Sequence, residues 1–331
     1  MARVVIFAPS PLLTVTIEEH GGDDELHLHA GGQGVWQARM LRRMGIEVTL
    51  CCALIGESGG VLRALLEEEG FAVASIDAEG SGGGYVHDRR GGERVAIVEL
   101  AGSSLERHDL DELYNVALRE AVSADAVILS GPAGEEVLPH EVYRRLAADL
   151  KAAGRVVIVD LAGERLKAAL EGGVDLAKVS DEELADDGRA DKDDETSIVA
   201  AMRQLAREGA RTVIVSRSPE PILLLHDGRL HRVQMPEFET ADTRGAGDSL
   251  TAGVTAAIAR GEQMIDAITL GAAAGALNVT RHGLGTGDAE AIEKLRALAR
   301  VMSETKEKQE AAARVSPEQL AGATVEKEDE A

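Results

Sequence analysis

Residues 141–160, EVYRRLAADLKAAGRVVIVD, join a helical segment to a continuous apolar strand, and this pair of elements indicates the fold class. We expect the helix over residues 141–153 and the strand over residues 156–160. The strand does not alternate apolar with polar positions, which is typical of a strand buried on both faces of its sheet. Helices are therefore expected to cover both faces of a parallel sheet.

The same alternation of strand and helix extends in both directions along the chain. Continuous apolar strands are expected at residues 4–8, 126–129, 176–179 and 213–216, with a further helix at residues 197–208. This pattern predicts an α/β fold with a doubly wound, mainly parallel sheet. Two alternating stretches, near residues 12–30 and 83–100, do not fit such a sheet, and we expect them to form a small antiparallel lid.

The length of the chain leaves room for one large domain or for two ordinary ones. The chain has 331 residues, and its 44% of hydrophobic residues can fill a substantial core. We place the domain at residues 1–300. The stretch 301–331 is rich in Glu, Lys, Ala and Gln and has little to bury, so it is expected to be an acidic tail that is disordered or partly helical.

The overall charge restricts the classes of partner. A formal net charge of −23 repels phosphate backbones and anionic membrane surfaces, so nucleic-acid and membrane partners are not expected. Cys51 and Cys52 are adjacent, which is a poor geometry for a disulfide. The N-terminal apolar run is too short for a signal peptide, and no apolar window reaches the length of a membrane span. These features predict a cytoplasmic protein.

The stretch that carries chemistry is residues 242–249, Asp-Thr-Arg-Gly-Ala-Gly-Asp-Ser, directly before a helix of small residues. A Gly-Ala-Gly turn at a helix N-terminus exposes backbone N–H groups and predicts an anion site. Asp248 in that site suits a base that takes a hydroxyl proton beside a phosphoryl group. Alternatively, Asp248 caps the helix and the glycines permit close packing. Neither a Walker A loop nor a dinucleotide-binding fingerprint occurs in the sequence.

Two stretches of this chain resemble the signatures of the ribokinase-like (PfkB) sugar kinases. Residues 242–249 with the following helix are similar to the C-terminal signature, and Gly31-Gly32-Gln33-Gly34 with its helix is similar to the N-terminal one. The resemblance covers about residues 3–300 and is closest to the 1-phosphofructokinase and tagatose-6-phosphate kinase branch.

The resemblance implies an ATP-dependent kinase that phosphorylates a hydroxyl of a sugar or sugar phosphate. Asp248 would be the catalytic base, and the amides of Gly245, Ala246 and Gly247 would stabilise the transferring phosphoryl group. An Asn-x-x-Glu element helps to hold Mg²⁺ in the family. Here Glu183 matches its acid and Ser180 replaces its Asn.

The resemblance also implies the binding residues. The positions expected at the acceptor are Thr14, Gly32, Gln33, Gly34, Trp36, Arg94 and Ser130. Those expected at the nucleotide are Lys178, Ser180, Ser216, Ser218, Thr243 and Asn278. Because such lids often pair between subunits in this family, the resemblance implies a homodimer formed through the lid.

Several positions depart from the pattern of the phosphosugar branch. Thr14 replaces an Asp, Gln33 replaces a Lys and Trp36 replaces an Asn, and the lost Lys charge weakens the case for an anionic acceptor. Pro221 fixes φ where the family has a Gly, so the loop near the adenine is expected to change shape. Two alternatives stay open: a kinase of an unphosphorylated sugar or nucleoside, and a catalytically weak sugar- or nucleotide-binding regulatory relative.

Overall fold

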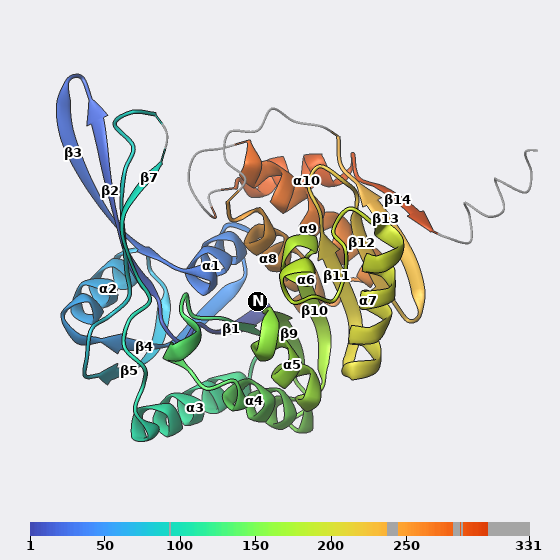
Figure 1. Ribbon diagram of the computed structural model, residues 1–331, viewed down its shortest axis with the longest axis horizontal. Helices are drawn as coiled ribbons and strands as arrows, with labels where there is room; N and C mark the ends of the chain where they lie inside the picture. The colour runs from blue at the N-terminus through green and yellow to red at the C-terminus, as the bar shows by residue number, and fades with distance from the viewer. Residues whose placement is uncertain (93, 237–243, 281–284, 286, 304–331) are drawn as a thin grey trace, which may run out of the picture.

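The computed structural model describes residues 1–92, 94–236, 244–280, 285 and 287–303, which form two sheets with helices on both sides of the larger one (Figure 1). The larger sheet contains β1 (Arg3–Phe7), β4 (Glu47–Ile55), β5 (Ala72–Ala78), β8 (Ala126–Ser130), β9 (Val156–Asp160), β10 (Val174–Ser180), β11 (Ala210–Ser216), β12 (Ile222–His226), β13 (Arg229–Gln234) and β14 (Arg300–Ser303). The strand order is β14-β13-β12-β11-β10-β9-β8-β1-β4-β5.

The strands from β5 to β11 are all parallel, and β12 to β14 continue the sheet antiparallel. From the central β1 the chain winds outward through β4 and β5 on one side and through β8 to β11 on the other. The predicted doubly wound, mainly parallel sheet is thus confirmed. In such sheets ligands bind outside the carboxyl ends of the strands, near the point where the winding reverses.

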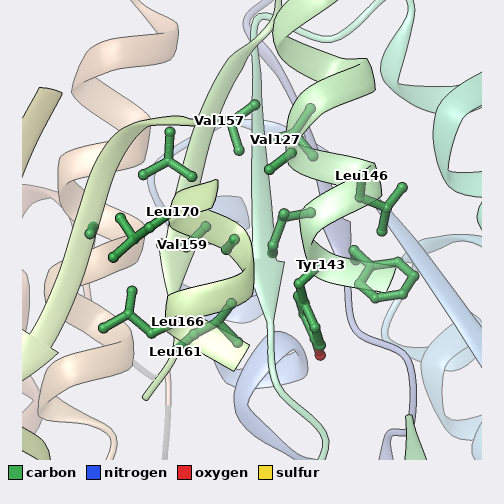
Figure 2. Packing of buried hydrophobic residues seen from close by; sticks show 14 of the residues in the cluster. Val127, Tyr143, Leu146, Val157, Val159, Leu161, Leu166 and Leu170 are labelled. Atoms are coloured by element: carbon green, nitrogen blue, oxygen red, sulfur yellow. The ribbon is translucent and has the colours of Figure 1, made fainter. Parts of the chain in front are cut away.

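Helices cover the two faces of the sheet as two separate cores. One face carries α3 (Arg107–Ala121), α4 (Glu141–Ala152), α5 (Gly163–Gly172), α6 (Asp181–Asp186) and α7 (Glu195–Glu208). The other carries α1 (Gln33–Arg43), α2 (Gly56–Glu68), α8 (Ala246–Ala259), α9 (Met264–Val279) and α10 (Ala289–Arg296). Figure 2 shows the first core, where Val127, Val157 and Val159 of the sheet pack near Tyr143 and Leu146 of α4. Because both faces of the sheet are buried, apolar and polar residues do not alternate along these strands.

Small residues let α8 and α9 pack closely on the second face. A Cβ added at Gly253 of α8 would lie 2.7 Å from the Cα of Gly271 in α9, which is a steric clash. The Ala- and Gly-rich sequences of both helices are therefore needed for this approach. The packing holds the start of α8 near the carboxyl ends of the parallel strands, where the candidate site lies.

The lid is a four-stranded sheet that projects from the main domain (Figure 1). Its strands are β2 (Leu12–His20), β3 (Asp23–Gly31), β6 (Gly84–Asp88) and β7 (Val95–Leu100), in the order β3-β2-β6-β7. The outer pairs are antiparallel, but β2 and β6 run parallel, so the predicted purely antiparallel lid is corrected to a mixed sheet. Both β2 and β6 enter the lid directly after the parallel strands β1 and β5, and they therefore keep a common direction.

Two further predictions concern the C-terminal boundary of the domain and membrane-spanning segments. The last strand, β14, crosses the domain boundary predicted at residue 300, and the rest of the predicted tail, 304–331, lies outside the described residues. Among the helices described, none is long and apolar enough to cross a membrane.

Candidate active site

Three polar residues stand side by side at the carboxyl ends of neighbouring parallel strands. Ser130 of β8 is in register with Asp160 of β9, and Asp160 is in register with Lys178 of β10. Their side chains lie on the face of the sheet that packs against α1 and α8. The other side chains of these strands on that face are apolar. The sheet therefore ends in a polar layer beneath the start of α8.

Asp160 is the centre of this layer. It is only 1% exposed, and its carboxylate accepts hydrogen bonds from Gln37 Nε2 at 3.0 Å, Thr251 Oγ1 at 2.8 Å and Lys178 Nζ at 3.1 Å. Ser130 Oγ in turn donates to Gln37 Oε1 at 2.6 Å. Because a buried carboxylate is costly unless its oxygens are bonded, this network fixes α1 and α8 relative to the sheet.

Lys178 is a buried cation shared by several carboxylates. Burial alone would lower the pKa of its ammonium, but the charges of Asp160, Glu183 and Asp248 raise the pKa above its ordinary value. Lys178 therefore stays protonated. A Cβ added at Gly247 would lie 2.6 Å from Lys178 Nζ, so a side chain at this position would displace the ammonium from its place beside the turn.

The turn before α8 has the geometry of an anion site. Gly245 precedes the helix with a φ of 71°, a left-handed conformation that favours glycine. The helix begins at Ala246, so the N–H groups of its first turn have no partners within the helix. These amides, the helix dipole and the adjacent ammonium of Lys178 all favour an anion here.

Asp248 lies in the first turn of α8 and is half-buried. Burial and the nearby charges of Asp160 and Glu183 raise the pKa of its carboxyl to about 8, although Lys178 and a hydrogen bond from Gln33 act in the opposite direction. Gln33 also accepts a hydrogen bond from the N–H of Gly131 at 3.0 Å. The Gln33 side chain thus holds Asp248 in a fixed position relative to the end of β8.

The residues predicted to bind the acceptor separate into two groups. Thr14, Trp36 and Arg94 line one large cavity between the lid and helices α1 and α2. The others lie at the base of the site and have partners within the protein. Gly32 precedes α1, Gly34 packs against Ala8, Gln33 bonds Asp248, and the buried Ser130 bonds Gln37. Acceptor contacts of all seven residues stay predictions.

The residues predicted to bind the nucleotide follow β10 and β11. Ser180 and Ser216 are in register at the ends of these strands, and Ser218 is exposed in the loop that follows β11. In that loop the buried Arg217 donates to the carbonyl of Pro221 at 3.0 Å and forms an ion pair with Glu195 at 2.8 Å. The Arg217 side chain thus links this loop to Pro221 and to Glu195. The changed shape predicted for the loop rested on Pro221.

Asn278 and Thr243 complete the predicted nucleotide set. Asn278 uses both ends of its amide within the protein: Nδ2 donates to the carbonyl of Arg244 at 2.6 Å, and Oδ1 accepts from the N–H of Gly285 at 3.3 Å. It therefore anchors the turn before α8. Thr243 lies outside the described residues.

Glu183 belongs to a capping box at the start of α6. Its Oε2 accepts from the N–H of Ser180 at 2.7 Å, while its own N–H donates to Ser180 Oγ at 3.1 Å. Among the residues that the structure describes, hydrogen bonds reach only Oε2 of Glu183, so Glu183 fits the role of a water-mediated Mg²⁺ ligand. No group of three or more His, Cys, Asp or Glu that could hold a metal occurs in the described part of the chain. A hydrated Mg²⁺ on nucleotide phosphates needs only one or two carboxylates.

Three residues of the central network were not predicted from the sequence: Asp160, Gln37 and Thr251. Asp160 could have been found, because it is the polar last residue of an otherwise apolar strand. Gln37 and Thr251 carry no comparable signal, since polar residues in helices are common and only the packing shows which ones face the sheet.

The doubly wound sheet, the lid and a carboxylate beside helix N-terminal amides form the architecture of a phosphotransferase for a small acceptor. Comparison with known proteins gives the same class. The model of the pfkB family of carbohydrate kinases matches residues 14–291. A 1-phosphofructokinase of Vibrio cholerae is 26% identical over 268 residues, which cover 81% of this chain and 84% of that enzyme. The ATP-dependent 6-phosphofructokinase isozyme 2 of Escherichia coli is 27% identical over 257 residues, covering 76% of this chain and 82% of that enzyme.

Solved structures show the same fold. Phosphofructokinase-2 from Escherichia coli superposes with a TM-score of 0.78 at 24% identity, covering 90% of this chain and 99% of that one. A ribokinase from Arabidopsis thaliana superposes with a TM-score of 0.68 at 21% identity, covering 89% and 99%. The fold is thus ribokinase-like.

The chain belongs to the pfkB family of carbohydrate kinases. It is a phosphofructokinase-like sugar kinase, a phosphotransferase with an alcohol group as acceptor, and kinases of this family use ATP. This confirms the resemblance seen in the sequence.

Proposed function

We propose that the protein transfers the γ-phosphoryl group of ATP to a hydroxyl of a sugar or sugar phosphate, with Asp248 as the base. The observation that carries the proposal is the place of Asp248. A carboxylate with a pKa raised to about 8 lies in the same helical turn whose N–H groups are available to an anion. A base of that pKa matches physiological pH.

In the proposed reaction the acceptor hydroxyl gives its proton to the Asp248 carboxylate as its oxygen bonds to the γ-phosphorus. The bond from that phosphorus to the bridging oxygen breaks, and ADP leaves. The amides of Gly245, Ala246 and Gly247 and the ammonium of Lys178 oppose the charge of the transferring group. When Mg²⁺ is bound through Glu183, it neutralises charge on the nucleotide phosphates.

Measuring turnover with a panel of possible acceptors tests this function directly. We expect ADP release from Mg-ATP in the presence of one or more of fructose 1-phosphate, fructose 6-phosphate, tagatose 6-phosphate, free hexoses, ribose and nucleosides. Turnover with only unphosphorylated sugars or nucleosides would favour that class of acceptor. If no acceptor raises ADP release above the level of Asp248→Asn while the protein still binds ligands, the protein is a binding relative and the proposed function is wrong.

The outer face of the lid supports a homodimer. Register places Val15, Leu26, Leu28, Val98 and Leu100 on one face of this sheet, with Ile17 and Val86 between them. Leu26 is 66% exposed and Val98 is 40% exposed. A contiguous apolar face of this kind marks an interaction surface, and a twofold axis lets the same face cover itself. We therefore propose a second copy of this chain as its partner.

Charge on this outer lid face should separate the dimer. We expect wild-type protein at micromolar concentration to sediment as a dimer and the double variant Leu26→Glu/Val98→Glu to sediment as a monomer, because the pairing would bury four carboxylates. Val122→Glu, at an exposed apolar position beyond α3, is the matched control and should leave the dimer intact. A monomeric wild-type protein would contradict the proposal.

A further inference from the structure

Helix α1 carries two glutamines, Gln33 and Gln37, one turn apart on the same side of the helix. Each side chain connects the end of β8 to a carboxylate. Gln37 Oε1 accepts a hydrogen bond from Ser130 Oγ at 2.6 Å, and its Nε2 donates to Asp160 at 3.0 Å. Gln37 is 0% exposed, so this first bridge belongs to the interior of the fold.

Gln33 repeats this arrangement at Asp248. Its Oε1 accepts a hydrogen bond from the N–H of Gly131 at 3.0 Å, and its amide donates to the carboxylate of Asp248. Gln33 and Asp248 are both half-buried. The second bridge therefore lies at the accessible edge of the polar layer, beside the turn before α8.

The backbone at the end of β8 determines which way the Gln33 amide points. A backbone N–H can only donate, so the N–H of Gly131 requires the amide oxygen on its side and leaves the NH₂ group for Asp248. The reversed amide would place its NH₂ group against that N–H and its oxygen against a carboxylate. The backbone therefore keeps a hydrogen-bond donor directed at Asp248.

Three charged groups from three other elements also act on Asp248. Lys178 of β10 favours the carboxylate form, whereas Asp160 of β9 and Glu183 of α6 oppose it, and burial opposes it as well. Lys178 Nζ also donates to Asp160 at 3.1 Å, so two carboxylates share its charge. The Gln33 amide is neutral, and it favours the carboxylate form of Asp248 through a directed hydrogen bond instead of through charge.

We propose that Gln33 is a positioning residue of the phosphoryl transfer, which directs the Asp248 carboxylate toward the acceptor hydroxyl and does not itself bind the acceptor. The inference rests on the proposed kinase function. It replaces the expectation drawn from the sequence, which placed Gln33 among the acceptor-binding residues. Both ends of its amide are used within the protein, by Gly131 and by Asp248. Removal of this donor should therefore make Asp248 harder to deprotonate.

The pH dependence of Gln33→Leu tests this role. Loss of a hydrogen bond to a charged group should move the acid limb of kcat/KM up by about one pH unit, so that kcat/KM at pH 7 falls about tenfold. The loss should appear in kcat, and the KM values for the best acceptor and for ATP should change less than about twofold. A residue that binds the acceptor would instead give a raised KM and an unmoved acid limb.

Gln33→Lys should move the acid limb in the other direction. An ammonium beside the Asp248 carboxylate favours the ionised form, so the limb should lie about one pH unit below that of the wild type. A residue needed only for packing would not give opposite shifts in the two variants. The proposal is wrong if the limb of Gln33→Leu coincides with that of the wild type, whether or not the KM for the acceptor rises.

Gln204→Leu is the matched control. The exposed Gln204 of α7 also donates to a carboxylate, that of Glu208 at 2.8 Å. Its replacement makes the same chemical change on a helix outside the site, so the pH profile should be that of the wild type. An acid limb that moved as far in Gln204→Leu as in Gln33→Leu would contradict the proposal.

A titration without turnover keeps this result separate from failure of the kinase function. Carbon-13 NMR of protein labelled at the aspartate carboxyl groups follows Asp248 directly, because its signal is the one missing from Asp248→Asn. Even if no acceptor is turned over, the titration midpoint of this signal should be highest in Gln33→Leu and lowest in Gln33→Lys. Equal midpoints in the wild type and both variants would overturn the positioning role, whereas the kinase function would still be decided by the panel of acceptors.

Discussion

Replacing Asp248 by Asn is expected to lower kcat by about 10³- to 10⁴-fold, at the upper end of what a positioned general base contributes. Asparagine keeps the shape of the side chain and its hydrogen bond with Gln33 but cannot take the acceptor's proton. The KM for ATP should stay nearly unchanged because the amides of the turn are intact. Steady-state ADP release with the best acceptor measures the effect, and a loss below tenfold would show that Asp248 is not the base.

The pH profile of the wild-type enzyme gives an independent check of the same residue. Asp248 must be deprotonated to act, and its pKa in the folded protein is raised to about 8. The value of kcat/KM should therefore rise about tenfold per pH unit below pH 8 and level off above it. A profile that is flat from pH 6 to pH 9 would contradict the assignment.

The same shift predicts that Asp248→Asn is well folded and more stable at high pH. Above an ordinary carboxyl pKa of about 4, the unfolded wild-type chain releases this proton while the folded protein retains it up to about pH 8. Folding is therefore penalised progressively as the pH rises between those two values, and asparagine removes the penalty. The melting temperature of the variant should exceed that of the wild type at pH 8 and approach it near pH 4.

The sequence predicted the strands of the main sheet more fully than it predicted which strands pair and which side chains lie together. The apolar strand at residues 156–160 is β9 at those same bounds, because burial on both faces is visible in composition alone. The register between strands is not visible in this way. Lys178 was therefore expected only at the nucleotide, whereas it is paired with Asp160, 18 residues earlier in the chain. The parallel pairing of β2 with β6 in the lid escaped prediction for the same reason.

Local backbone geometry was predicted best where short sequence motifs determine it. The left-handed Gly245 and the amides that follow it depend on local sequence, so the motif indicated a helix N-terminus, although the helix begins at Ala246, inside the stretch that was expected to precede it. Gln33 and Asn278 carry flexible amides that can turn to a ligand or to the protein. The structure shows both bonded to the protein, to Asp248 and to Arg244, and local sequence cannot distinguish these possibilities.

The buried ion pair between Lys178 and Asp160 should give the largest loss of stability. Lys178→Met removes the ammonium 3.1 Å from a carboxylate that is 1% exposed, and a similar apolar volume takes its place. Breaking one partner of a buried pair leaves an uncompensated charge, so we expect the free energy of unfolding to fall by about 3–5 kcal/mol. Urea unfolding followed by circular dichroism measures this.

The double variant Lys178→Met/Asp160→Asn separates the charge from the packing. Asparagine is neutral and can still bond Gln37 or Thr251, so the double variant should regain a large part of the lost stability. Activity should not return with it, because the ammonium beside Gly247 is also expected to oppose the charge of the transferring phosphoryl group. Recovery of both stability and turnover would show that Lys178 only balances Asp160. Recovery of stability alone would assign the same buried cation to the fold and to the reaction, which explains why a lysine is buried in β10.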